Sequence, residues 1–109
     1  MGIPDETPSS QAAHAHPAVF GALADPTRRH LLEVLIAARR ASATSLAEGL
    51  PVSRQAVIKH LHVLETAGLV SRVRSGREVL YLPRSDPLEA SARWLAELAA
   101  AQSVRTTST

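Results

Sequence analysis

Ser53 is followed by polar and basic residues whose spacing places them on one face of a helix. On a wheel of about 100° per residue, polar side chains gather on one side and apolar ones on the other. The side that carries the polar residues comprises Ser53 at the helix start, Arg54, Gln55, Lys59 and His62, together with one apolar residue, Ile58. Such a face fits the major groove of double-stranded DNA, where Gln pairs with adenine and Arg or Lys with guanine or phosphate.

Two residues of this segment allow more than one interpretation. Ile58 interrupts the polar face, where an exposed isoleucine can contact a thymine methyl group. Single exposed apolar residues are also common on ordinary surfaces. Ser53 can cap the helix, and the same helix N-terminus attracts a phosphate. His60 falls on the packed side of the wheel, so we expect an internal role for it.

The positive charge of the chain is concentrated in its middle. The whole chain has a net charge of +2, whereas residues 25–84 hold ten Lys and Arg against five Asp and Glu. Solvated surface arginine is one explanation of this excess, and a centre that binds a polyanion is the other. The basic helical face lies within this segment and favours the second explanation.

A pair of helices joined by a short turn must position this face. Residues 42–48 predict a short helix that Gly49 and Pro51 end. Ser42, Thr44 or Ser45 could cap it, and Glu48 would complete a capping box with Ser45. Ser53 then begins a second helix that runs to about Ala67. This arrangement is a helix-turn-helix candidate.

Two further helices precede this pair. Asp25 can cap a helix whose first position suits Pro26, and the apolar spacing continues it to about Arg40. A shorter helix follows Pro17 and carries Phe20 on its apolar side.

After the helix-turn-helix, the pattern of side chains changes from a helical period to a period of two residues. Residues 69–84 alternate in the manner of two strands, with Ser75 and Gly76 between them, and predict a β-hairpin. Arg74 and Arg77 make its tip basic.

The last predicted helix, from Asp86 to about residue 101, is apolar around most of its circumference. An alanine-rich helix with weakly apolar flanks is one explanation. We favour the other, which is burial on two sides, by the helix's own core and by a partner subunit. Residues 1–15 and 102–109 are expected to be flexible tails, which leaves residues 16–101 as one domain.

Several classes of protein are disfavoured by what the sequence lacks. It contains no cysteine, which excludes disulfides, thiolate metal sites and cysteine nucleophiles and fits a reducing cytoplasm. No apolar run approaches the ~18 residues that cross a membrane. We find no phosphate-binding glycine loop, metal triad or nucleophile beside a base, so we predict neither an enzyme nor a bound cofactor.

Three stretches together resemble the ArsR/SmtB family of bacterial winged-helix repressors. They are ALADPTRRHLLEVL, SLAEGLPVSRQAVIKHLHVLETAGLV and RVRSGREVLYL, and the resemblance covers about residues 17–100. It implies a mainly helical α+β fold of four helices, a β-hairpin wing and a last helix. It also implies a homodimer whose interface is made by the first and last helices, with two recognition helices about one DNA turn apart that read an inverted repeat. We expect the protein to be cytoplasmic and nucleoid-associated. The expected interface residues are Phe20, Leu88, Trp94, Leu95 and Leu98.

The chain departs from the metal-sensing members of that family. It has no Cys-x-Cys pair on the 42–48 helix and no histidine on the last helix. Ile58 also stands directly before the KHL sequence, where the family usually has a small polar residue. The sequence therefore resembles the non-metal, often autoregulating ALADPTRR members.

Two alternatives remain open from the sequence. One is a nickel- or zinc-responsive regulator that uses His14 and His16, although two such histidines make a weak site. The other is a winged helix that binds a protein instead of DNA. An unidentified small-molecule or metal effector is compatible with every one of these interpretations.

Overall fold

The structure, a computed structural model, describes residues 17–108. Three of its helices are α2 (Pro26–Ala38), α3 (Ala43–Glu48) and α4 (Arg54–Thr66). α2 and α4 begin at the predicted caps, and α3 begins at Ser42, one of its three candidate caps. The side chains of Asp25, Ser42 and Ser53 each accept a hydrogen bond from the backbone N–H three residues on, at 3.0, 3.1 and 3.1 Å. These bonds satisfy N–H groups that lack partners within the helix.

The ends of the helices agree with the prediction only in part. α4 is followed by Gly68, whose φ of +80° suits glycine, and the Leu69 N–H returns to the Leu64 carbonyl at 2.9 Å. α2 was expected to reach Arg40 but ends at Ala38. Arg39 adopts a φ of +76°, and its N–H donates to the Leu35 carbonyl at 2.7 Å. The chain therefore turns two residues early.

A short strand that the sequence did not predict follows this turn. β1 (Ala41–Ser42) pairs antiparallel with β3 (Glu78–Pro83), which also pairs with β2 (Val70–Ser75). The sheet order is β1-β3-β2. Two residues are too few for an alternating pattern, so β1 is visible only from its partner strand.

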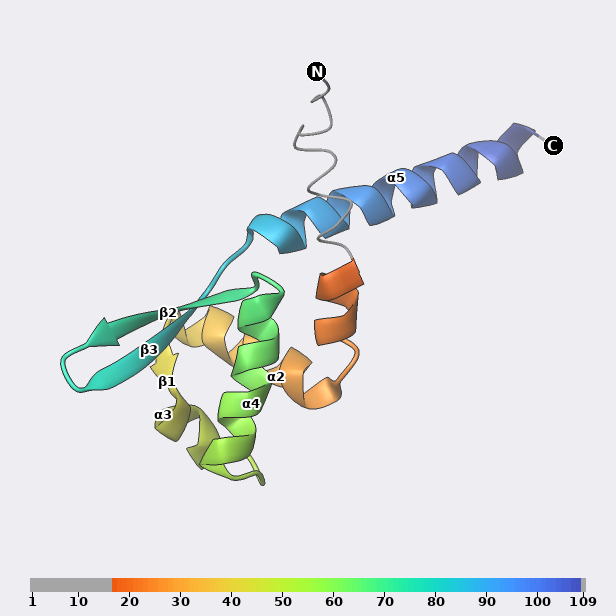
Figure 1. Ribbon diagram of the computed structural model, residues 1–109. Coiled ribbons are helices and arrows are strands. Elements are labelled where there is room, and N and C mark those ends of the chain that lie inside the picture. The colour runs from red at the N-terminus through yellow and green to blue at the C-terminus, as the bar shows by residue number, and fades with distance from the viewer. Residues whose placement is uncertain (1–16, 109) are drawn as a thin grey trace, which may run out of the picture.

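The hairpin of β2 and β3, called the wing below, has a two-residue turn. Ser75 pairs with Glu78, so the turn is Gly76-Arg77, one residue later than predicted. Gly76 has a φ of +64°, a conformation that glycine adopts without a steric penalty. The wing extends to the left in Figure 1.

The core lies between the helices and the inner side of the wing. Its aliphatic composition agrees with the scarcity of aromatic residues in the sequence. The largest fully buried side chains are Leu31, Leu35, Leu61, Leu64, Leu69, Val19 and Val57.

The last helix, α5 (Asp86–Ser108), lies beside the first helix. Residues 17–22 are helical, and α5 passes them and continues beyond the body (Figure 1). The helix was expected to end near residue 101, and its continuation to Ser108 corrects that boundary. The predicted N-terminal tail lies outside the described residues. The mainly helical chain with a three-stranded antiparallel sheet is a winged helix-turn-helix, as the sequence predicted.

Candidate nucleic-acid interface

The two sides of α4 differ as the helical wheel predicted. Val57, Leu61 and Leu64 are fully buried, and each contributes roughly 1.5–3 kcal/mol by leaving water. The opposite side presents Gln55, Lys59 and His62 to solvent. The buried residues fix the rotation of the helix about its axis, so these three polar side chains face outward together.

Arg54 has a contact that the sequence did not predict. Its Nε donates a hydrogen bond of 3.0 Å to the Thr44 hydroxyl of α3. Thr44 is its only recorded partner among residues 17–108. The contact joins the two helices of the motif and leaves the terminal guanidinium nitrogens available to a phosphate or a base edge.

Ile58 is less exposed than the sequence predicted. It is half-buried and packs against the core cluster. Packing within its own chain accounts for an apolar residue at this position. A thymine contact is then limited to the part of the side chain that remains exposed.

An ion pair joins the wing to α4. Arg72 Nε donates to Glu65 Oε2 at 3.0 Å, from β2 to the last turn of α4. Arg74 and Arg77 are exposed at the tip, as predicted. Sequence reasoning missed Arg72, because Glu65 becomes its neighbour only when the hairpin folds back on α4.

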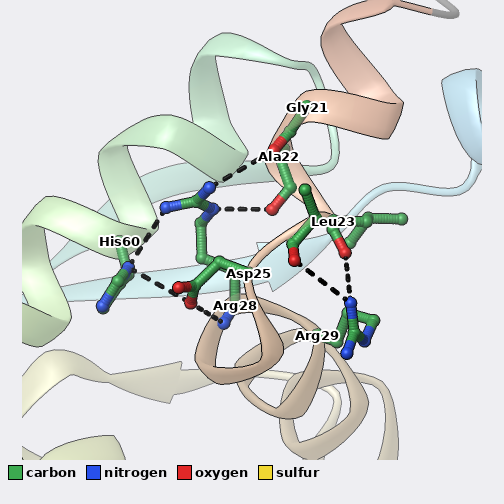
Figure 2. Close-up of polar contacts among 8 residues, drawn as sticks. Gly21, Ala22, Leu23, Asp25, Arg28, Arg29 and His60 are labelled. Carbon is green, nitrogen blue, oxygen red and sulfur yellow. Dashed lines mark hydrogen bonds and ion pairs between the residues drawn. The ribbon is translucent and has the colours of Figure 1, made fainter.

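His60 lies on the packed side of α4, as predicted, and faces the start of α2. Its Nδ1 is 3.4 Å from Arg28 Nη1 and 4.0 Å from Asp25 Oδ2 (Figure 2). The Arg28 backbone N–H donates to Asp25 and holds the pKa of that carboxyl below its ordinary value of 3.8. Sequence reasoning did not assign Arg28 a role. Its position one turn into α2, close to the end of the preceding helix, was the available signal.

The residues expected at a subunit interface differ in their exposure. Phe20 and Trp94 bring the first helix and α5 together, with ring centroids 5.8 Å apart. Leu95 and Leu98 are each 49% exposed. Leu88 packs against the core of its own chain, which accounts for its partial burial without a partner. Val104, 66% exposed, extends the apolar surface of α5 past the predicted helix end.

The described part of the chain offers no cluster for a metal. Within residues 17–108, no three His, Cys, Asp or Glu side chains lie together in a way that could hold an ion. His14 and His16 lie outside these residues. A hollow between α2 and α3, lined in part by His30, Val34 and Arg40, measures about 190 Å³. Sites for small molecules usually occupy roughly 300–1,000 Å³.

No helix within residues 17–108 is long and apolar enough to cross a membrane.

A helix-turn-helix followed by a basic hairpin defines the winged class of DNA-binding proteins. Comparison with known sequences agrees with this class. Residues 23–73 match the family described as Helix-turn-helix domain. The chain is 32% identical over 77 residues to the transcriptional repressor SdpR of Bacillus subtilis (strain 168), a match that covers 71% of this chain and 84% of that protein. It is 37% identical to the uncharacterized HTH-type transcriptional regulator YuzN of the same strain, over 66% of this chain and 85% of that protein.

A solved structure is similar over nearly the whole described chain. An ArsR-like transcriptional regulator from Rhodococcus sp. RHA1 superimposes with a TM-score of 0.78 and 41% identity. The match covers 88% of this chain and 90% of the other. The chain belongs to the ArsR family of winged helix-turn-helix regulators. It is a DNA-binding transcriptional regulator.

Proposed function

We propose that the protein is a homodimeric repressor that reads an inverted-repeat operator. α4 enters the major groove, and the wing lies on the flanking backbone or minor groove. The observation that carries this proposal is the outward face of α4, which is opposite three fully buried side chains. Repression is the activity named for the relative SdpR, and DNA upstream of its own gene is the first operator to test.

The proposed contacts follow from the chemistry of each side chain. Gln55 pairs with adenine, and the free end of Arg54 contacts guanine or phosphate. Lys59, His62 and the exposed edge of Ile58 extend the contact along the groove. Arg74 and Arg77 contact phosphates, and the N-terminus of α4 at Ser53 receives another. The protein would act at the nucleoid of a bacterial cytoplasm.

Dimerisation is supported by the apolar surface of α5. Trp94, Leu95, Leu98 and Val104 are each more than a third exposed in the single chain. A second copy can cover this surface along a two-fold axis, which suits an inverted repeat.

Binding to DNA upstream of its own gene tests the proposal. Fluorescence anisotropy would follow labelled duplexes at several salt concentrations, with and without added Ni²⁺ or Zn²⁺. We expect tight binding that weakens steeply with salt, since each phosphate contact contributes about −0.9 to the slope of log K against log salt. We expect the metals to change nothing.

Other outcomes would replace this proposal with a different one. An affinity that changes with metal would direct attention to His14 and His16. Binding of a protein partner that is insensitive to salt, with no retention on any DNA at low salt, would favour a protein-binding winged helix.

A further inference from the structure

Two adjacent arginines at the start of α2 bind the C-terminal end of the first helix. Arg28 donates from Nε to the Ala22 carbonyl at 2.6 Å and from Nη2 to the Gly21 carbonyl at 3.3 Å. Arg29 donates from Nη1 to the Leu23 carbonyl at 2.7 Å. These carbonyls belong to the negative end of the helix, so the two guanidinium charges strengthen the contact (Figure 2).

Of these two arginines, Arg28 alone also reaches α4. Its Nη1 lies 3.4 Å from Nδ1 of His60. A guanidinium has donors only, so a hydrogen bond between the two side chains requires His60 Nδ1 as the acceptor. The Arg28 backbone N–H also donates to the Asp25 cap of α2. Arg28 therefore contacts the first helix and the recognition helix from a third helix (Figure 2).

We propose that Arg28 is a positioning residue that sets the angle between the first helix and α4. This inference rests on the proposed dimer, with the first helix added to its interface through Phe20, which contacts Trp94 of α5. The angle then determines how far apart the two α4 helices of a dimer lie. Arg28 thus selects the spacing of operator half-sites without touching DNA.

The position of His60 makes α4 sensitive to this contact. His60 follows Lys59 directly and precedes His62 by two residues, so a tilt of α4 at His60 moves the groove-facing side chains. Half-sites of such dimers are about 34–36 Å apart, one turn of DNA. A displacement of a few ångströms in each protomer misaligns one recognition helix when the other is seated.

The test uses operators whose half-sites are moved apart or together by one and two base pairs, and a single half-site. The operator is first located by footprinting on DNA upstream of the protein's own gene. We expect wild type to prefer one spacing by about tenfold or more. Arg28→Gln should reduce that preference to less than about threefold and leave half-site affinity unchanged.

Matched variants separate this role from a general loss of stability. Arg29→Gln removes a similar contact to the first helix but none to α4, so it should keep the wild-type spacing preference. His60→Leu should resemble Arg28→Gln. His60→Asn keeps an acceptor near the position of Nδ1 and should therefore keep the wild-type spacing preference.

A distance measurement tests the same inference without DNA. The sequence has no cysteine, so Thr66→Cys provides a single spin label on the exposed end of α4 in each protomer. We expect one narrow distance distribution in an otherwise wild-type dimer and in Arg29→Gln. Arg28→Gln should shift or broaden that distribution.

The outcomes distinguish the two proposals. A wild type that binds every spacing and the half-site equally would overturn both the dimeric operator and the role of Arg28. A wild type with a spacing preference and a label distance that Arg28→Gln leaves unchanged would overturn the role of Arg28 alone. Equal weakening by Arg28→Gln on all DNAs, with an unchanged label distance, would also overturn it.

Discussion

At the scale of single residues, Arg54 and Gln55 are adjacent but differ in freedom. Arg54 is tethered through Thr44, so part of the entropy cost of ordering its side chain is met before DNA binds. Gln55 is exposed and has no recorded partner within residues 17–108. We therefore assign base reading first to Gln55 and shared base and phosphate contact to Arg54.

Replacement of Gln55 by alanine should weaken operator binding and leave nonspecific binding almost unchanged. A lost bidentate base contact is worth about 1–3 kcal/mol. Anisotropy titrations on operator and scrambled duplexes measure both affinities. As a contrast, Lys59→Gln should weaken binding to both DNAs and reduce the salt slope by about 1. Equal losses on both DNAs for Gln55→Ala would contradict base reading.

Asp25 should make the stability of the protein depend on acid pH. The pKa of its carboxyl is below 3.8 in the folded state, chiefly because the Arg28 N–H donates to it. The unfolded state therefore binds the proton more readily, and the stabilisation is present at neutral pH and lost as pH falls through the folded-state pKa.

Urea titrations from pH 7 to about pH 2 compare wild type with Asp25→Asn, which can cap α2 but does not titrate. The difference between their urea midpoints should be constant near neutral pH. Below about pH 4 the midpoint of wild type should fall relative to that of Asp25→Asn. A difference that is constant over the whole range would show that this carboxyl has the same pKa in both states.

At the scale of elements, α4 is held at both ends by its neighbours. Its N-terminal end carries the Ser53 cap and the Arg54–Thr44 bond to α3. Its C-terminal end joins β2 through Glu65 and Arg72. This ion pair is partly exposed and contributes less than about 1 kcal/mol, so it adds only weakly to the contact between α4 and β2.

Ser53 has two roles that substitution can separate. Ser53→Ala removes the cap and should cost about 1 kcal/mol of unfolding free energy. This corresponds to a fall in Tm of roughly 4–8 °C. Ser53→Asp retains an acceptor for the Ala56 N–H and should keep the stability, but its charge repels a phosphate and should weaken DNA binding. Wild-type affinity in Ser53→Asp would exclude a phosphate at this helix end.

At the scale of the whole molecule, α5 differs from the other helices in how little of it is covered. Its first turns contact the body through Leu88 and the Trp94–Phe20 pair. From residue 92 to residue 104 every side chain is exposed. Exposed apolar groups gathered on one helix are typical of an interaction site, and the proposed dimer would cover them.

Leu98→Glu should convert the proposed dimer to a monomer, because it places a charge in the middle of the apolar surface. Sedimentation equilibrium measures the change in mass, and operator affinity should fall with it. Glu89, Arg93 and Glu97, spaced four residues apart, form a charged stripe on α5. Arg93→Gln removes a charge from that stripe and should leave the dimer intact. An unchanged mass for Leu98→Glu would place the interface elsewhere.

The sequence by itself determined the local features of the fold. The starts of α2 and α4 were predicted because Asp25 and Ser53 bond to groups three residues away. For α3 the sequence left Ser42, Thr44 and Ser45 open as caps, and the structure selects Ser42. The hairpin and the two sides of α4 were predicted from periods of two and 3.6 residues, which follow from backbone geometry. The residues of the outward face of α4 could be named for the same reason.

The tertiary structure decided the contacts between segments that are distant in the sequence. β1 exists only because β3 lies beside it, and the burial of Ile58 depends on the helices packed against it. Arg28 and His60 are 32 residues apart. No periodicity reports such a contact, because it forms only after the hydrophobic core has brought α2 and α4 together.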